Sequence, residues 1–412
     1  MRFDTILTGG GLSALVCGIR LQRNGVKTAV VSSGQSSLFF FSGAFGFLSV
    51  LPDGSPVERP LDALAALPEN HPYSKIGAGN IAGYADGFKD FFASCGVKLN
   101  GCGGSNLMRY LAAGGMKRAW ASLPELDLFP SDKPLAGKRV LVVRIPGFLD
   151  YFPTIICDSL KKEGASVRMS DVTVPEIDAL KNSANVVRSI SLAKVLEQPE
   201  VLSSFIMAVR SAASDDDEII VLPQVFGLKS EDGMDMIRES FGQKVLFFNT
   251  MTPSVPGNRL YVRLKAAYEA AGGVFISGTA RGGVIEGDVL RRISVEEQDM
   301  EADSFVLATG SFVSRGLVSS YDSVAEPVLG LDVDYLKDRS EWTSADIGDR
   351  QSFMGFGVRT DDAFHPSVNG VPVRNLYAAG SILSGTDSLH EGSGAGVAVF
   401  TAMRVSDLIL GR

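Results

Sequence analysis

The sequence predicts an α/β fold that opens with a parallel β-α-β unit and holds a second, inserted α/β region. Three observations predict it. A glycine-rich turn, "TGGGLSA", joins a short apolar strand to a helix near the start of the chain. The next strand is almost entirely apolar, and strand-like and helix-like stretches alternate again between residues 101 and 249. The 412 residues suffice for two or three hydrophobic cores.

The opening unit reads as strand, turn, helix and strand. Residues 3–8 form a short β-type run, residues 12–23 have helical apolar spacing, and Asn24 and Gly25 end the helix. Residues 26–31 form a largely apolar strand. A strand with so few polar residues is buried on both faces of its sheet, which indicates parallel pairing.

The middle region predicts a separate α/β domain. The expected strands are residues 138–145, 218–223 and 244–249, and the expected helices are residues 151–163, 193–213 and 234–241. Residues 252–260 lead into a helix that runs to residue 271, and short β runs follow between residues 274 and 293. The last part of the chain resembles the opening unit again, with strands at residues 304–310 and 375–380 and a helix at residues 394–409. We therefore expect one discontinuous domain, residues 1–98 and 252–412, and an inserted domain, residues 99–251.

Composition excludes several classes of protein. Asp and Glu outnumber Lys and Arg by 47 to 39, and no basic run stands out, so no nucleic-acid partner is expected. The four cysteines show no metal-type spacing, which predicts no metal site and a reducing cytosol. The start of the chain lacks the pattern of a signal peptide. The most apolar window, residues 37–51, is too short to span a bilayer.

The first glycine turn predicts a nucleotide-type cofactor. Gly9, Gly11 and Ala14 fit the GxGxx(G/A) pattern in its required context, after a strand and at the start of a helix. Gly10, Leu12 and Ser13 complete a turn whose backbone N–H groups can approach a phosphate. The alternative is a tight turn without a ligand.

The acidic residue that binds an adenosine ribose is expected at the end of the second strand. Ser32, Ser33 and Gly34 stand there instead. A serine cannot accept from both ribose hydroxyls as a carboxylate does. This argues against NAD and NADP and, more weakly, against the adenosine half of FAD, whereas FMN is compatible. The alternative is that Ser32 and Ser33 are ordinary turn residues.

Two late motifs separate flavin proteins from nicotinamide proteins. The stretches "FVLATGSF" and "NLYAAGSILSGTD" resemble motifs of the Rossmann-like flavoprotein family that includes glycine oxidase and fumarate reductase. The resemblance implies that Thr309, Gly310, Gly380 and Ser381 line the flavin, with Ser381 replacing the usual Asp. It also implies that the loop at Ser42 and Gly43 lies against the ring.

The stretch "EGSGAGVAVF" opens the C-terminal helix. Its residues Glu391, Gly392, Gly394 and Gly396 lie where the helix N–H groups could face the flavin pyrimidine oxygen. The alternative is a glycine-rich helix that simply packs on a sheet.

Several longer stretches resemble one family, the B subunits of anaerobic glycerol-3-phosphate dehydrogenases. They include "SSGQSSLFFFSGAFGFLSVLPDG", "HPYSKIG", "VLPQVFGL", "TMTPSVPGNRL" and "EPVLGLDV", in order along the chain. The resemblance implies a flavin protein with FMN, or alternatively FAD. Its implied partners are a catalytic A subunit that carries FAD and an iron–sulfur, membrane-anchoring C subunit. The implied reaction oxidises sn-glycerol 3-phosphate to dihydroxyacetone phosphate and sends electrons to menaquinone, from a cytoplasmic position at the inner face of the membrane.

Few residues suit the chemistry. His390, beside the predicted helix entry, is the candidate base at the flavin edge, with a surface histidine as the alternative. Lys117, Arg118, Arg259 and Arg263 are candidates for binding a substrate phosphate, with solvated surface charge as the alternative. Because bases and phosphate-binding groups are scarce, we expect this chain to relay electrons. A non-catalytic assembly protein with a degenerate flavin site is the second interpretation, and an NAD-dependent dehydrogenase is the least favoured.

Overall fold

The computed structural model describes residues 2–180 and 187–412 and confirms the predicted α/β fold. Its main sheet has the strand order β12-β2-β1-β15-β14-β13, and β22 pairs with β15 off this path. Parallel pairing joins β12, β2, β1, β15 and β22, whereas β14 and β13 are antiparallel. The strands are β1 (Arg2–Thr8), β2 (Thr28–Ser32), β12 (Val274–Ser277), β13 (Ala280–Glu286), β14 (Val289–Val295), β15 (Gln298–Leu307) and β22 (Leu376–Ala378).

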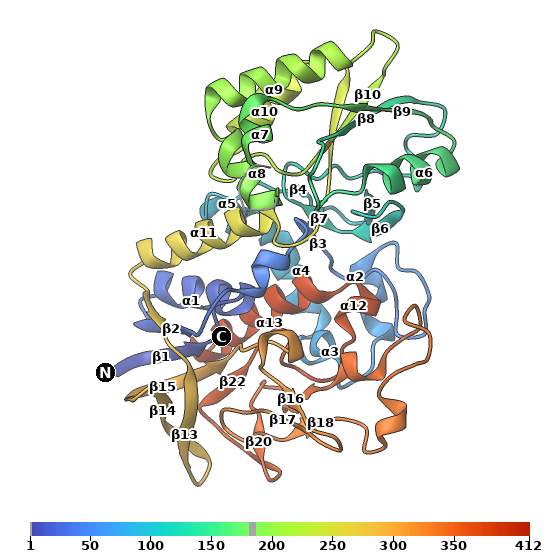
Figure 1. Cartoon of the computed structure of the whole chain (residues 1–412). Coiled ribbons are helices and arrows are strands. Elements are labelled where there is room, and N and C mark those ends of the chain that lie inside the picture. Colours follow the sequence, from blue (N-terminus) through green and yellow to red (C-terminus); the bar gives the residue numbers. More distant parts are fainter. Residues whose placement is uncertain (1, 181–186) are drawn as a thin grey trace.

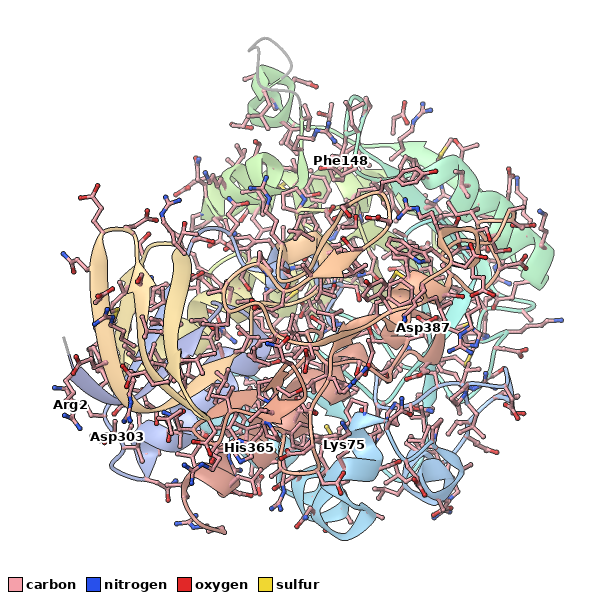
Figure 2. The ribbon with its side chains drawn as sticks, turned by 90° about the horizontal axis from the view of Figure 1, so that it is seen from below. Arg2, Lys75, Phe148, Asp303, His365 and Asp387 are labelled. Carbon is pink, nitrogen blue, oxygen red and sulfur yellow. The ribbon has the colours of Figure 1, made fainter. Side chains whose placement is uncertain are left out.

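The central strands of this sheet are buried in the hydrophobic core. Helices α1 (Leu12–Arg23) and α13 (Gly394–Ile409) pack against each other, and α11 (Val255–Ala270) lies beside α1 (Figure 1). Apolar residues of β1, β2 and β15 are buried, as the sequence of the second strand predicts. At the start of β1, Arg2 points toward Asp303 on β15 (Figure 2), and the two form an exposed ion pair of 2.9 Å.

Short elements complete this half of the chain. Strand β3 (Ala44–Phe45) pairs with β7 (Ala121–Ser122), which pairs with β4 (Asn100–Gly101). The short helices are α2 (Pro60–Ala63), α3 (Pro72–Ile76), α4 (Ala78–Asp86), α5 (Phe88–Ser94) and α12 (Ser388–Glu391). The remaining two-stranded pairs are β16 (Val318–Ser319) with β17 (Val324–Ala325), β18 (Val333–Asp334) with β19 (Gly357–Val358), and β20 (Ser367–Val368) with β21 (Val371–Pro372).

A second, four-stranded sheet with its own core occupies the other half (Figure 1, top). Its order is β11-β10-β8-β9, all parallel. The strands are β8 (Arg139–Arg144), β9 (Ser166–Asp171), β10 (Ile219–Pro223) and β11 (Lys244–Phe248). The helices are α6 (Pro153–Glu163), α7 (Pro175–Leu180), α8 (Ser189–Leu196), α9 (Pro199–Ala212) and α10 (Asp232–Glu239). The strand order reverses direction between β8 and β10, and such switch points face ligands in open α/β sheets.

A β-hairpin connects the two halves. Strands β5 (Leu107–Tyr110) and β6 (Met116–Ala119) pair antiparallel. Tyr110 on β5 belongs to the second core, whereas Trp120, directly after β6, belongs to the first core. The hairpin therefore reaches across the junction of the two halves. The division at residues 99 and 251 stays a prediction.

Most predicted elements appear within two residues of their expected ends. The predicted helix at residues 193–213 is the main exception, because it is two helices, α8 and α9. Pro199 cannot donate the N–H that a continuous helix needs at that point, and it stands as the first residue of α9. No described helix has the length and apolar character needed to cross a bilayer.

Candidate functional site

A cavity of about 810 Å³ lies at the carboxyl ends of β1 and β2 and extends to the start of α13. Of the residues predicted from the sequence, fifteen line it: Gly9, Gly10, Gly11, Leu12, Ser13, Ser32, Ser33, Gly34, Lys117, Arg118, Thr309, Gly310, Ser381, Gly392 and Gly394. The size is within the range of small-molecule and cofactor sites. Four cationic side chains, Arg109, Lys117, Arg118 and Arg315, contribute to the wall, and none of its described lining residues is an Asp or Glu.

The N-terminus of α1 opens into this cavity without a side-chain cap and without an acidic residue in its first turn. Gly9 has φ +114°, and a Cβ there would lie 2.1 Å from the carbonyl oxygen of Ala308. Gly11 differs, because a Cβ on it would meet nothing closer than the Ser37 hydroxyl at 3.9 Å. The turn thus packs tightly against the protein at Gly9 and faces the open cavity at Gly11. Its uncapped N–H groups suit a phosphate.

The cavity continues past the second strand. Ser32, Ser33 and Gly34 line it, and so do the small residues Gly278 and Thr279, between β12 and β13, and Ala280, the first residue of β13. In place of the expected carboxylate, neutral hydroxyl and backbone groups line this part of the cavity.

The first late motif also faces the cavity. Thr309 and Gly310 follow β15, and the Thr309 hydroxyl oxygen is buried without a hydrogen-bond partner among the described residues. A buried polar atom without a partner calls for a ligand or water. Gly380 does not line the cavity. Its backbone has φ +81°, and a Cβ there would lie 2.1 Å from the Ser13 hydroxyl, so glycine lets β22 approach α1.

The entry to α13 has the predicted exposure to the cavity. Gly392 and Gly394 line the wall, and no side chain caps the helix. Gly396 lies on the protein side instead, where a Cβ would be 2.2 Å from the Tyr73 hydroxyl. The N–H groups of Gly394 and Ala395 are therefore available to a ligand, whereas the Gly396 N–H donates to the Gly46 carbonyl and Gly396 allows close packing of α13 on α3.

Glu391 lies behind this wall rather than in it. The carboxylate is fully buried and accepts hydrogen bonds from Thr386 at 2.8 Å and Ser393 at 3.0 Å. His71 lies 3.2 Å away. The His71 Nδ1 accepts from the Tyr73 N–H, so its Nε2 carries the proton and donates to Glu391. Burial raises the pKa of Glu391, but the His71 and Thr386 hydrogen bonds outweigh it, and the net pKa is lowered. This network fixes the turn that presents Gly392.

His390, the candidate base, does not line the cavity, although it is only partly exposed on α12. Ser42 and Gly43 are also outside the wall, while their neighbours Phe41 and Ala44 are in it. The Ser42 carbonyl accepts from the Asn249 side chain at 2.7 Å, so this loop contacts the inserted sheet. His390, Ser42 and Gly43 therefore do not line the cavity as the sequence predicted.

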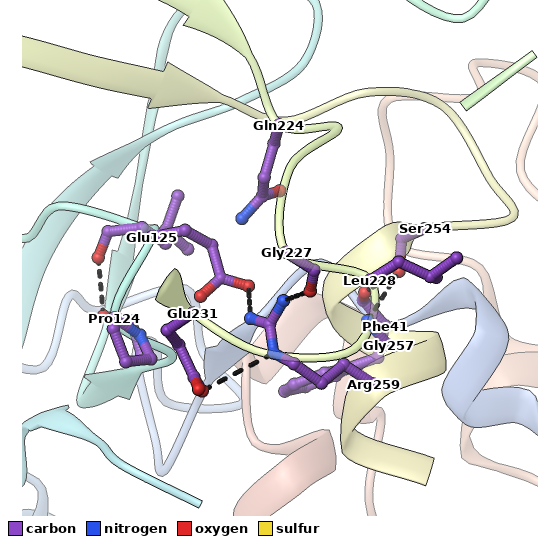
Figure 3. Close-up of polar contacts among 12 residues, drawn as sticks. Phe41, Pro124, Glu125, Gln224, Gly227, Leu228, Glu231, Ser254, Gly257 and Arg259 are labelled. Carbon is purple, nitrogen blue, oxygen red and sulfur yellow. Dashed lines mark hydrogen bonds and ion pairs between the residues drawn. The ribbon is translucent and has the colours of Figure 1, made fainter. Parts of the chain in front are cut away.

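The structure places Arg259 and Arg263 outside the cavity, contrary to their expected role as phosphate-binding residues. The fully buried Arg259 bonds to the Glu125 carboxylate and the Gly227 carbonyl (Figure 3), and lies 3.6 Å from Glu231. Arg263 forms a two-point ion pair with Glu231. Their donors are engaged by protein carboxylates. They join α11 to the inserted half instead of binding a ligand.

The cations that do reach the cavity include one that the sequence did not single out. Arg109 and Lys117 are directly opposed across the hairpin β5–β6, and Arg118 follows Lys117. Burial lowers the pKa of Arg109 to about 10. Burial and then the positive charge of Arg109 lower the pKa of Lys117.

Other lining residues were missed for different reasons. Ser36 and Ser37 follow the predicted serine loop and could have been included by proximity. Gly46 lines the wall where a Cβ would lie 2.0 Å from the Gly392 carbonyl oxygen. Arg109 and residues 278–280 follow no recognisable motif, since only the fold brings them to this cavity.

Comparison with known proteins agrees with this geometry. The family model described as an FAD binding domain matches residues 4–397, which confirms the predicted flavoprotein fold. The B subunit of anaerobic glycerol-3-phosphate dehydrogenase from Yersinia pestis bv. Antiqua (strain Antiqua) is 35% identical, over 100% of this chain and 98% of its own length. The proteins of the same name from Pectobacterium atrosepticum and Actinobacillus pleuropneumoniae are 35% and 33% identical, over 100% of this chain and 99% and 100% of theirs.

Solved structures show more distant likeness. The 3-ketosteroid Δ1-dehydrogenase of Sterolibacterium denitrificans is 12% identical, with a TM-score of 0.45 and coverage of 100% and 99% of the two chains. Glycine oxidase from Bacillus cereus is 10% identical, with a TM-score of 0.35 and coverage of 99% and 95%. Neither value supports an argument about function.

The family model corrects the expected cofactor. It supports FAD, the alternative, and does not support FMN as the main cofactor.

Proposed function

The chain belongs to the family of anaerobic glycerol-3-phosphate dehydrogenase B subunits, which contain an FAD binding domain, and on this premise we propose that it carries FAD and transfers the electrons released from sn-glycerol 3-phosphate. It is a flavin-dependent oxidoreductase subunit. In the proposed reaction, the complex oxidises sn-glycerol 3-phosphate to dihydroxyacetone phosphate, and electrons continue toward menaquinone in fumarate or nitrate respiration.

The single observation that carries the proposal is the cavity itself, with an uncapped helix N-terminus at each of two places and no acid on its described wall. The turn at Gly9 and Gly11 would hold the pyrophosphate, and residues 278–280 would face the adenosine. Thr309 supplies a buried hydroxyl that lacks a partner within the described chain. The N-terminus of α13 would stabilise negative charge on the reduced ring. Bound FAD supplies hydride acceptance and one-electron transfer.

The wall favours an electron relay over direct oxidation of the alcohol. Removing a hydride from an alcohol also requires a base for the hydroxyl proton. No residue that lines the described cavity is a His, Asp, Glu, Tyr or Cys. The ionisable groups that do line it are the cationic arginines and Lys117.

Assembly follows from the same proposal. A catalytic A subunit with its own FAD would deliver electrons, and an iron–sulfur C subunit would receive them and anchor the complex. The chain would then be cytoplasmic and held at the inner face of the membrane by its partner. The names of the relatives support only that a complex with other subunits exists.

Acid release of the bound cofactor, followed by chromatography, tests the proposal. We expect FAD at about one equivalent per chain. Recovery of FMN would overturn the cofactor assignment. The relay is tested separately, since glycerol 3-phosphate alone should not reduce the flavin of the purified chain at a catalytic rate.

A second function is favoured by one observation. Ser32 and Ser381 stand where related motifs place acids, which fits a non-catalytic assembly protein with a degenerate flavin site. A chain that stays colourless after gentle purification and does not take up added FAD would support this alternative.

A further inference from the structure

The hairpin β5–β6 places two positive charges against each other. Arg109 on β5 and Lys117 on β6 are directly opposed partners in the antiparallel register. Like charges in this arrangement destabilise a sheet. Arg118 lines the same cavity from the next position. A protein that keeps these charges together needs a negative charge close by to compensate them.

Asp387 is near enough to Lys117 to raise its pKa, but no carboxylate among the described residues, 2–180 and 187–412, forms an ion pair with Arg109, Lys117 or Arg118. Arginines elsewhere commonly do so, as Arg144 does with Asp171. The Nε of Arg109 is buried and has no hydrogen-bond partner in the described part of the chain. A buried guanidinium donor without an acceptor is costly unless a ligand supplies the acceptor.

Neighbouring residues hold Arg109 in this position. The Asn249 side chain donates to the Gln224 side chain at 2.6 Å and to the Ser42 carbonyl, so its own oxygen faces Arg109 at 3.3 Å. Gln224 and Asn249 follow β10 and β11, at the carboxyl edge of the inserted sheet. The inserted half therefore directs a guanidinium into the cavity of the other half.

Lys117 lies beside the turn that leads into α13. A Cβ on Gly392 would be 3.7 Å from the Lys117 Cε, and the Lys117 ammonium donates to the Leu389 carbonyl at 3.1 Å. The cofactor phosphates have their own place at the N-terminus of α1. Lys117 and the two cations next to it on the hairpin are consequently left for a second anion.

We propose that Arg109, Lys117 and Arg118 form an oxyanion subsite of this chain, which binds the phosphate of a small phosphate monoester beside the start of α13. Two or three cations match the two negative charges of a phosphate monoester better than the single charge of a carboxylate. Naming sn-glycerol 3-phosphate as the ester rests on the proposed function. The subsite itself requires only the phosphate.

The test uses the full chain loaded with FAD and measures binding by calorimetry and by the change in the flavin absorbance spectrum. The probes are sn-glycerol 3-phosphate, inorganic phosphate and, as the uncharged control, glycerol. We expect both phosphates to bind and glycerol not to bind. Lys117→Gln and Arg109→Gln should each weaken phosphate binding by about 10- to 100-fold, as expected for the loss of a charge-assisted contact.

Control variants separate this subsite from surface charge and from cofactor binding. Lys98→Gln removes the same charge from an exposed position and should leave phosphate binding unchanged. Arg109→Lys retains the charge and should restore part of the binding if Arg109→Gln folds poorly. FAD affinity should be equal in the wild type and in Lys117→Gln.

Three results would overturn the subsite. The FAD-loaded chain could fail to bind phosphate, or the wild type and Lys117→Gln could bind phosphate equally well. In the third result, Lys117→Gln would lose FAD as well as phosphate. The last would assign the cations to the cofactor. Failure to bind FAD at all would refute the proposed function instead. Phosphate binding with rapid flavin reduction would support the subsite and refute the relay.

Discussion

Alanine at Gly11 separates cofactor binding from folding. The backbone there has φ −87° and ψ −173°, which any residue adopts, and a Cβ would meet no atom closer than the Ser37 hydroxyl at 3.9 Å. We expect stability to fall by at most about 1 kcal/mol, the difference between Gly and Ala at a helix N-cap. The added methyl group would instead project into the cavity, where the turn is proposed to hold a phosphate. Losing one charge-assisted N–H contact costs about 1.5–3 kcal/mol, or about 10- to 150-fold in FAD affinity.

Gly9 provides the matched comparison. Alanine there would need φ +114° and would place its Cβ 2.1 Å from a backbone oxygen of Ala308. We expect a loss of about 3 kcal/mol or more in the free energy of unfolding, from strain and overpacking together. Urea denaturation of the apoprotein and titration with FAD, followed by flavin fluorescence, measure the two effects. The reasoning is refuted if Gly11→Ala binds FAD as tightly as the wild type, or if both variants lose equal stability.

Three further predictions follow from the ion pairs and the cationic wall. Arg259→Met should lower the free energy of unfolding by about 3–5 kcal/mol and leave FAD affinity unchanged, because Glu125 would remain buried without its partner. Urea denaturation of this variant and of the double variant Arg259→Met, Glu125→Gln measures the loss. Equal losses of stability in the two variants would contradict the prediction. The lowered pKa of Glu391 contributes stability at neutral pH that should disappear as the pH falls through and below 4.5, and Glu391→Gln should lack that part of the pH dependence in urea denaturation. Phosphate binding should begin to weaken below pH 10.5, the ordinary pKa of a lysine, because burial and Arg109 lower the pKa of Lys117 more than Asp387 raises it, and only the charged lysine attracts an anion. Calorimetry across the alkaline pH range measures this weakening. The Lys117→Gln variant should lack that part of the pH dependence.

Local sequence was sufficient wherever one element carried the whole signal. The helix limits at residues 12–23 and 394–409 were predicted as observed, since apolar spacing and flanking glycines act within a few residues. The cavity-lining role of Gly9 to Ser13 followed from a motif whose spacing reflects backbone geometry. Thr309 and Gly310 were found because they follow a strand in a recognisable late motif.

Charged residues were predicted less well, because their partners lie far away in the sequence. Arg259 and Arg263 share a helical face, as expected, but that face meets Glu125 and Glu231 from the inserted half. Glu391 was placed near the flavin, yet its carboxylate turns inward to His71, 320 positions earlier. No local pattern distinguishes a cation with an acidic partner from one without.

The sequence by itself determined the β-α-β start, the two glycine-rich helix entries, the existence of an inserted α/β region and the family. These depend on periodicity and on short-range steric limits, which the order of residues fixes directly. Only the tertiary structure decided which cations face the cavity, how far the cavity extends past the second strand and which glycines serve packing. Those properties depend on which distant groups desolvate and neutralise each other, and that is set when the two halves of the chain pack together.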